Sequence, residues 1–259
     1  MTSKFLSYFK KTWRESKVIF KESWQIYKQN YKLFLRILIP LLILAVLLTI
    51  LNIFDFTTNL KFANFSIPIY LFLSAASFVV GLWTQIVLIR LIWNSIVHQS
   101  IEEKSLKQEG WRDIVPFLWV NILTGLIILG GTILFIIPGL IFSIWYYFAS
   151  YIFAVEKIHG YGALKASKDL SQGRFWIVVG KIVLISLMYL AIMLIIIGAP
   201  TLIIIAATKF TNIVNLSNQW WFEALQTFAA FLTLPLNLGF WTILYKNLKE
   251  NKAEIKPTV

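Results

Sequence analysis

The sequence predicts an all-α, polytopic integral membrane protein with six transmembrane helices and an N-terminal amphipathic helix at the membrane interface. Composition supports this class, because the 259 residues are 58% apolar and 14% charged, with a mean hydropathy of +0.73. Globular chains carry roughly 25% charged residues. Span length supports it too, because several charge-free apolar runs reach the ~20 residues that a helix needs to cross ~30 Å of hydrocarbon.

Six apolar runs define the expected spans. They are Leu33–Phe54, Pro68–Ile96, Phe117–Ile137, Leu140–Val155, Phe175–Ala207 and Phe222–Tyr245. We therefore expect a single membrane domain over residues 32–249. An interfacial helix over residues 1–31 precedes it, and a cytoplasmic tail over residues 250–259 follows it.

Residues that disturb a helix occur between the third and fourth runs and within the fifth run. Pro138 and Gly139 lie inside a long apolar stretch, and we expect them to form the hairpin turn between the third and fourth spans, slightly inside the bilayer. The fifth run is about 33 residues long, which exceeds one upright span, and it contains Pro200. It is either one long tilted helix or a helix broken near its outer end at residues 198–200.

The basic residues predict the orientation. Of the 24 Lys and Arg residues, all except Lys61 and Lys209 fall on the side of the membrane that carries both termini. Basic residues accumulate in cytoplasmic loops, so we expect a cell-membrane protein with cytoplasmic termini. The net charge of +12 then favours anionic lipid headgroups as partners rather than nucleic acid.

The N-terminal 31 residues carry an aromatic stripe with basic residues beside it. At 100° per residue the stripe contains Phe5, Leu6, Phe9, Trp13, Phe20, Trp24, Tyr27 and Tyr31. Such a helix suits the cytoplasmic membrane interface. The alternative is that the stripe packs against the protein's own helices, and both roles can coexist. The residues expected to bind the interface are Phe9, Trp13, Arg14, Phe20, Lys21, Trp24 and Lys28.

Residues that could support catalysis are few. The chain has no cysteine and two histidines, His98 and His159. Glu156 precedes His159 at the spacing seen in bundle metal sites, but no span supplies the facing carboxylates that such sites use. No GxSxG, HExxH or Gly-rich phosphate loop occurs. We expect no enzymatic activity, no metal and no cofactor.

Four neutral polar residues lie within the expected spans: Gln85, Asn121, Gln226 and Asn237. Their most direct role is hydrogen bonding between helices. The alternative is that they line a path for a transported small molecule or lipid. The two roles differ in whether these side chains meet neighbouring helices or converge on one cavity.

An ordered set of segments carries a family resemblance. The core segment is FIIPGLIFSIWYYFASYIFAVEKIHGYGALKASKDLSQGRFWIVVGK, with WQIYKQNYKLFL before it and LPLNLGFWTILYKNLKENK after it. This set resembles a bacterial membrane family related to the membrane domain of glycerophosphodiester phosphodiesterases. The resemblance implies a six-span helical architecture. In bifunctional members a phosphodiesterase barrel follows, but here about 14 residues follow the sixth span, so we do not expect that activity.

Taken together, these features predict a non-enzymatic multi-pass membrane protein that binds lipid or a membrane-protein partner. The alternative function is transport of a small molecule or lipid through a neutral polar pathway.

Overall fold

The computed structural model describes residues 2–53, 63–100, 102–207 and 220–255, and every element in this part of the chain is helical. Six of its helical segments are long and apolar enough to cross a membrane. The protein is thus an all-α, multi-pass membrane protein, as the sequence predicts. The elements are α1 (Thr2–Ile53), α2 (Ala63–Ile96), α3 (Glu103–Arg112), α4 (Ile114–Leu134), α5 (Ile136–Tyr146), α6 (Ala149–Glu156), α7 (Tyr161–Ser171), α8 (Phe175–Met193), the π-helix η1 (Leu194–Gly198), α9 (Ala199–Ala207) and α10 (Trp220–Ile255).

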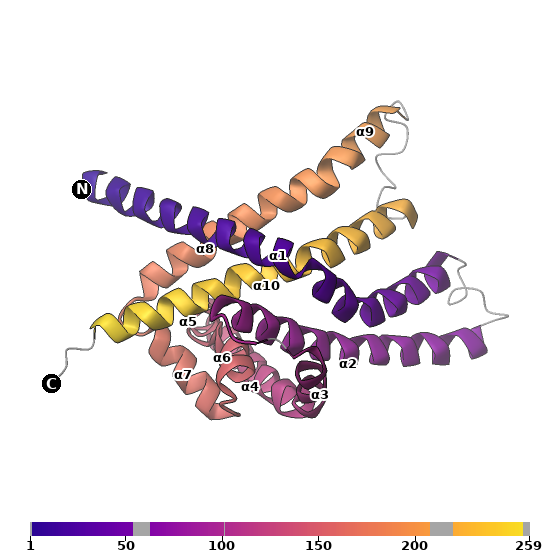
Figure 1. The fold of residues 1–259 in the computed structure, drawn as a ribbon, viewed down its shortest axis with the longest axis horizontal. Helices are drawn as coiled ribbons and strands as arrows, with labels where there is room; N and C mark the ends of the chain where they lie inside the picture. Colours follow the sequence, from indigo (N-terminus) through magenta and orange to yellow (C-terminus); the bar gives the residue numbers. More distant parts are fainter. Residues whose placement is uncertain (1, 54–62, 101, 208–219, 256–259) are drawn as a thin grey trace.

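The long helices form a fan (Figure 1). Helix α1 packs along both α2 and α10, and its N-terminal half also contacts α8. The N-terminus of α1 and the C-terminus of α10 lie at the same end of the fan, whereas the tips of α2 and α9 lie toward the opposite end. The short helices α3, α6 and α7 pack beside α2 and the C-terminal half of α10.

Helix α1 is longer than the sequence analysis expected, because the interfacial helix and the first span are one element. It runs without interruption from Thr2 to Ile53, so the expected boundary at residue 31 is not a helix boundary. The axis changes direction in the second half of α1 (Figure 1). Pro40 lies in that half, and proline bends a helix because it lacks a backbone N–H and its ring crowds the preceding turn.

The fifth apolar run is one continuous helical rod and is not broken at residues 198–200. Helices α8 and α9 are joined without a loop through the π-helical turn Leu194–Gly198. Pro200 is the second residue of α9, and it cannot donate the hydrogen bond that an α-helix would require there. A π turn changes the local hydrogen-bond register, so the chain passes Pro200 as a continuous rod.

The turn between the third and fourth spans lies three residues earlier than expected. Phe135 is extended, with φ −159° and ψ 143°, and α5 begins at Ile136. Pro138 therefore lies in the first turn of α5, where a missing N–H costs little. Gly139 serves close packing instead: a Cβ atom there would lie 2.8 Å from Cα of Thr132 on α4.

The fourth span is itself interrupted between α5 and α6, and Ser167 of α7 forms hydrogen bonds with the backbone at the interruption. Its Oγ donates to the carbonyl oxygen of Trp145 at 2.7 Å and accepts the backbone N–H of Phe148 at 3.2 Å. Ser167 is fully buried. One hydroxyl thus satisfies a carbonyl and an amide that the interruption would otherwise leave unpaired.

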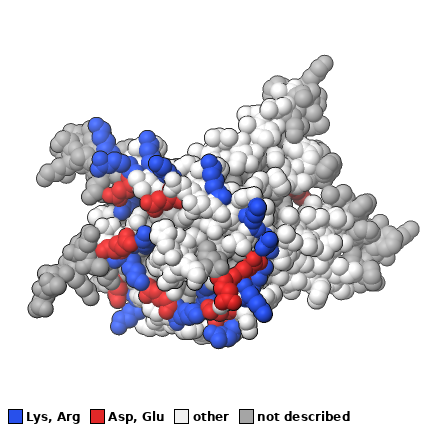
Figure 2. Space-filling model, viewed as in Figure 1, with Lys and Arg blue, Asp and Glu red and all other residues white. Residues whose placement is uncertain are grey.

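Charged side chains gather at one end of the molecule. Figure 2 shows Lys, Arg, Asp and Glu over the end of the fan that holds α3, α7, the N-terminal half of α1 and the C-terminal part of α10. We call this region the charged end. The described surface toward the tips of α2 and α9 is almost free of charge, and its apolar side chains are exposed, including Phe72 and Ile203. That distribution suits helices surrounded by lipid.

Candidate functional site

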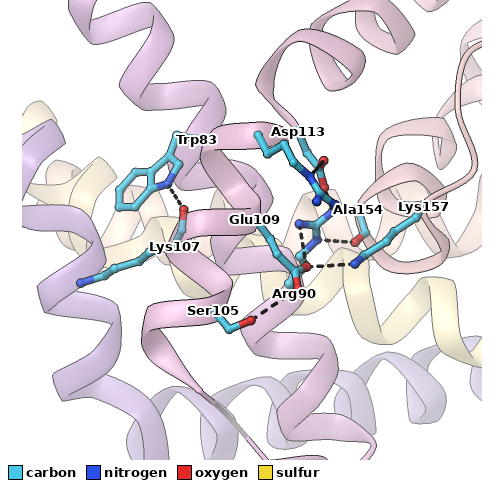
Figure 3. A network of polar contacts seen from close by, with 9 residues as sticks. Trp83, Arg90, Ser105, Lys107, Glu109, Asp113, Ala154 and Lys157 are labelled. Atoms are coloured by element: carbon cyan, nitrogen blue, oxygen red, sulfur yellow. Dashed lines mark hydrogen bonds and ion pairs between the residues drawn. The ribbon is translucent and has the colours of Figure 1, made fainter.

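The most extensive polar network at the charged end surrounds Arg90 of α2 (Figure 3). The Arg90 side chain is 5% exposed. Its Nη2 atom donates to Oδ2 of Asp113 at 2.6 Å, and Nε donates to the carbonyl oxygen of Ala154 at 2.8 Å. The Nη1 atom lies 3.5 Å from Oε2 of Glu109. A single guanidinium thereby connects α2, α3, α6 and the start of α4.

Helix α3 reaches this position because it packs closely on α2. Gly110 has no side chain, and a Cβ atom there would lie 2.5 Å from Cγ2 of Val87 and 3.1 Å from the ring of Trp83. Trp83 donates from Nε1 to the carbonyl oxygen of Lys107 at 3.0 Å, and it stacks on Trp111 with ring centroids 5.4 Å apart. These contacts hold α3 against α2 and present Glu109 to Arg90.

Glu109 is also bound by Lys157, whose Nζ lies 3.0 Å from Oε2. This hydrogen bond, followed by the charges of Lys157 and Arg90, lowers the pKa of the Glu109 carboxyl below its ordinary value. Lys157 itself has left-handed backbone geometry, with φ 56°, which is uncommon for a residue with a side chain. Its amide caps α6 by donating to the carbonyl oxygen of Phe153 at 3.0 Å.

A cavity of about 450 Å³ adjoins this network. Its walls come from the C-terminal end of α2, the segment that leads into α3, α3 itself and the end of α6. Most of the lining is polar. The lining residues are Arg90, Trp93, Asn94, Gln99, Ser100, Glu102, Ser105, Leu106, Glu109, Ala154, Val155 and Lys157.

Further ion pairs join the long helices at the charged end. Glu156 accepts hydrogen bonds from Lys249 at 2.8 Å and from the hydroxyl of Tyr245, which connects α6 to α10. Lys181 of α8, with 10% side-chain exposure, forms an ion pair with Glu15 of α1, with Nζ 2.9 Å from Oε2. Glu156 therefore has partners other than His159. The His159 ring instead packs perpendicular to the ring of Phe153, with the ring centroids 5.1 Å apart.

The aromatic stripe of α1 has two environments. Phe20 packs against Phe240 of α10, with ring centroids 5.8 Å apart, and the neighbouring positions Ser16, Ile19 and Ser23 are buried. This part follows the packing interpretation.

Trp13 and Trp24, in contrast, are each 41% exposed. Lys17 and Lys28 place their Nζ atoms 5.3 Å and 5.2 Å from the centroids of these two rings. We call these four residues, with the exposed Arg14 and Lys21, the aromatic–basic edge. The side chain of Phe9 lies outside the described residues.

The four neutral polar residues in the spans do not share one environment. Asn121 accepts a hydrogen bond from Ser150 of α6 at 2.8 Å, and Asn237 accepts one from Trp241 on its own helix at 3.1 Å. Gln226 is exposed on α10, and Gln85 is half-buried on α2. None of the four lines the 450 Å³ cavity.

The distribution of basic residues assigns Arg90, with the other Lys and Arg residues except Lys61 and Lys209, to the side of the termini, but it does not reveal the network around Arg90. Glu109 and Lys157 are 48 residues apart, and their pairing depends on how α3 folds back on α2. Two local signals were available. Arg90 follows a long apolar run, where a charge requires a partner, and Gly110 marks a close approach of helices.

The fold and this site define a multi-pass, all-α membrane protein with a charge-networked polar cavity at its charged end. No protein-family model, no curated protein and no solved structure matches this chain, so its function must be inferred from its own geometry.

Proposed function

We propose that this protein is a non-enzymatic, multi-pass protein of the cell membrane that binds anionic lipid headgroups through the aromatic–basic edge of α1. The observation that carries the proposal is the exposure of Trp13 and Trp24, at 41% each, with Lys17 and Lys28 over their rings. The opposite side of the same helix is already occupied by α8 and α10.

The chemistry of this edge suits a membrane interface. Indole rings prefer the headgroup level, where one part of the ring is apolar and the N–H remains hydrated. Each Lys or Arg near an anionic surface adds on the order of 1 kcal/mol of attraction. Arg14, Lys17, Lys21 and Lys28 extend along one side of α1 for three to four helical turns, so their contributions combine along the membrane surface.

The orientation rests on the distribution of basic residues. All but two of the 24 Lys and Arg residues lie on the side of the termini, and basic loops remain in the cytoplasm. The aromatic–basic edge then faces the cytoplasmic leaflet, which holds the anionic lipids that attract it.

Transport through a neutral polar pathway has weaker support. Asn121 and Asn237 are engaged by Ser150 and Trp241, as expected for residues that stabilise helix packing. The proposal of a non-enzymatic role rests on the sequence, which lacks the catalytic motifs considered above.

The full-length protein tests the lipid contact. Wild type in nanodiscs with increasing phosphatidylglycerol should retain anionic lipid on extraction, measured by native mass spectrometry, and retention should fall as salt rises. Replacing both exposed tryptophans (Trp13→Glu with Trp24→Glu) should abolish this preference while the Tm stays within a few degrees. Phe20→Glu is the contrasting variant, and it should lower the Tm because Phe20 packs on Phe240. Unchanged lipid retention in the double variant would refute the proposal.

A further inference from the structure

The cavity beside Arg90 offers a binding site that is distinct from the aromatic–basic edge. Its volume of about 450 Å³ falls within the range of small-ligand pockets. Its lining carries two cations, Arg90 and Lys157, and two carboxylates, Glu102 and Glu109. A ligand that enters it therefore meets both signs of charge within a few ångströms.

Arg90 supplies an anchor for an oxyanion. Among the described residues, its Nη1 atom has no hydrogen-bond partner, although the atom is buried. Glu109 approaches Nη1 to 3.5 Å, close enough for an ion pair but too far for a good hydrogen bond. Buried donors are nearly always satisfied, and guanidinium groups match the oxygens of carboxylates and phosphates. Lys157, half-exposed beside it, can donate to the same oxyanion.

The carboxylates supply the complementary partner for a cation. Glu102 is exposed at the start of α3, and its carboxylate makes no cap hydrogen bond. Glu109 stays ionised, because its pKa is lowered by Lys157 and Arg90. A multiply charged anion would be repelled by these two groups. A molecule that carries an ammonium beside an oxyanion satisfies all four charges.

The depth of the cavity indicates the source of such a molecule. Trp83 stacks on the half-exposed Trp111, and because tryptophans are enriched at membrane–water interfaces, we take this pair as the edge of the hydrocarbon. Arg90 lies seven residues further along α2, about 10 Å at 1.5 Å per residue. The headgroup layer extends about 5–7 Å beyond the hydrocarbon, so the Cα atom of Arg90 lies about 3–5 Å past it. A helical side chain tilts toward the N-terminus of its helix, which for α2 is the membrane side, so the guanidinium can close this gap and meet a lipid headgroup.

We propose that this cavity binds an aminoalkyl phosphate, the group that forms the headgroup of phosphatidylethanolamine. Its phosphate oxygens accept from Arg90 Nη1 and Lys157, and its primary ammonium donates to Glu102 and Glu109. A quaternary ammonium has no N–H to donate to these carboxylates, so a choline headgroup binds less well. The inference does not depend on the lipid contact of α1.

Native mass spectrometry of the full chain carrying Trp13→Glu and Trp24→Glu, which removes the anionic-lipid contact proposed for α1, tests this site with equal amounts of phosphatidylethanolamine, phosphatidylglycerol and phosphatidylcholine. In this background we expect preferential retention of phosphatidylethanolamine. Glu102→Gln, at an exposed position, should weaken it about tenfold, as expected for the loss of a charge-assisted hydrogen bond. Glu250→Gln is the matched control on α10, away from the cavity, and should have no effect. Lys157→Gln should also weaken retention, whereas Lys104→Gln on the exposed side of α3 should not.

Free O-phosphoethanolamine distinguishes the two sources of the ligand. If it displaces the retained lipid, the cavity accepts the soluble molecule as well as the headgroup. If it does not, the site requires the membrane-anchored form. Equal retention of the three lipids, or full retention by Glu102→Gln, would overturn the assignment.

Discussion

Oδ2 of Asp113 lies 2.6 Å from Nη2 of Arg90. Both side chains are buried, with 10% of Asp113 and 5% of Arg90 exposed. This pair lies at the junction of α3 and α4 and ties both to α2. Removing one partner of a buried ion pair leaves the other charge buried without compensation, which is strongly destabilising. An exposed ion pair contributes little to stability. The stability of the charged end should therefore depend strongly on Asp113.

Asp113→Ala should destabilise the protein by about 3–5 kcal/mol, because Arg90 would remain buried without its closest partner. Thermal unfolding in detergent, followed by circular dichroism, measures this effect as a lowered Tm. Glu103→Gln is the control. It breaks an exposed contact with Arg36 and the adjacent pair with Lys107, and it should cost about 1 kcal/mol or less. Equal shifts in the two variants would contradict the importance assigned to the Arg90 pair.

Ser167→Ala should cost about 1–3 kcal/mol, because it leaves the buried amide of Phe148 without its acceptor. Ser143→Ala offers a comparison of identical chemistry. Ser143 is half-exposed and bonds to Leu140 of its own helix, so its loss should change stability by less than about 0.5 kcal/mol. The same unfolding measurement distinguishes them. If Ser167→Ala left the stability unchanged, another group would have to form the hydrogen bonds with the Phe148 amide and the Trp145 carbonyl.

Gly139→Val should destabilise the α4–α5 hairpin by about 1–3 kcal/mol, because its side chain would overlap Thr132. Gly125→Ala on α4 is the control. A Cβ atom there meets nothing within 4 Å, and alanine favours a helix over glycine by up to about 1 kcal/mol. We expect the two variants to shift Tm in opposite directions. A tolerated Gly139→Val would show that the two helices can separate without cost.

The acid stability of α3 should depend on Glu109. Its pKa is lowered in the folded protein from an ordinary value of 4.5, so its contribution is fully present above about pH 4.5. The contribution is lost as the pH falls through the lowered value. Because the chain has no cysteine, a spin label on Lys104→Cys reports on α3 alone. Its spectrum should sharpen below about pH 4.5. In Glu109→Gln the spectrum should already be sharper at neutral pH, and a retained acid transition of full size would assign the effect to another carboxyl.

Much of this fold could be predicted from the sequence, because spans and charge bias are local properties. The apolar runs Leu33–Phe54 and Phe222–Tyr245 are recognisable from length and hydropathy alone. The N-terminal helix is also recognisable, but its continuity with the first span was overlooked. No glycine or proline occurs between Thr2 and Pro40, so nothing in that stretch ends the helix.

The hairpin turn and the site were harder to predict, for different physical reasons. Pro138 was read as part of the turn, yet proline is well tolerated in the first turn of a helix, and Phe135 makes the turn. The cavity requires α3 to lie against α2, and that contact depends on Gly110 and Trp83. Pairings between distant residues such as Glu109 and Lys157 follow from this packing and have no local pattern.

The apolar turn at Phe135 leads to a prediction about membrane depth. Phe135, Ile136 and Ile137 are 73%, 72% and 70% exposed, which would be unfavourable in water. We therefore expect the turn to lie within the bilayer. Single cysteines in the cysteine-free chain can test this with a membrane-impermeant thiol reagent. Phe135→Cys should react slowly from either side of the membrane, because the turn is surrounded by lipid. The same reagent tests the orientation that the basic residues predict. If α3 is cytoplasmic, Lys104→Cys should react only after the membrane is permeabilised. Lys61→Cys, on the expected outer side, should react in intact cells. Rapid labelling of Phe135→Cys in intact cells would place the turn in the outer aqueous phase, and labelling of Lys104→Cys there would invert the orientation.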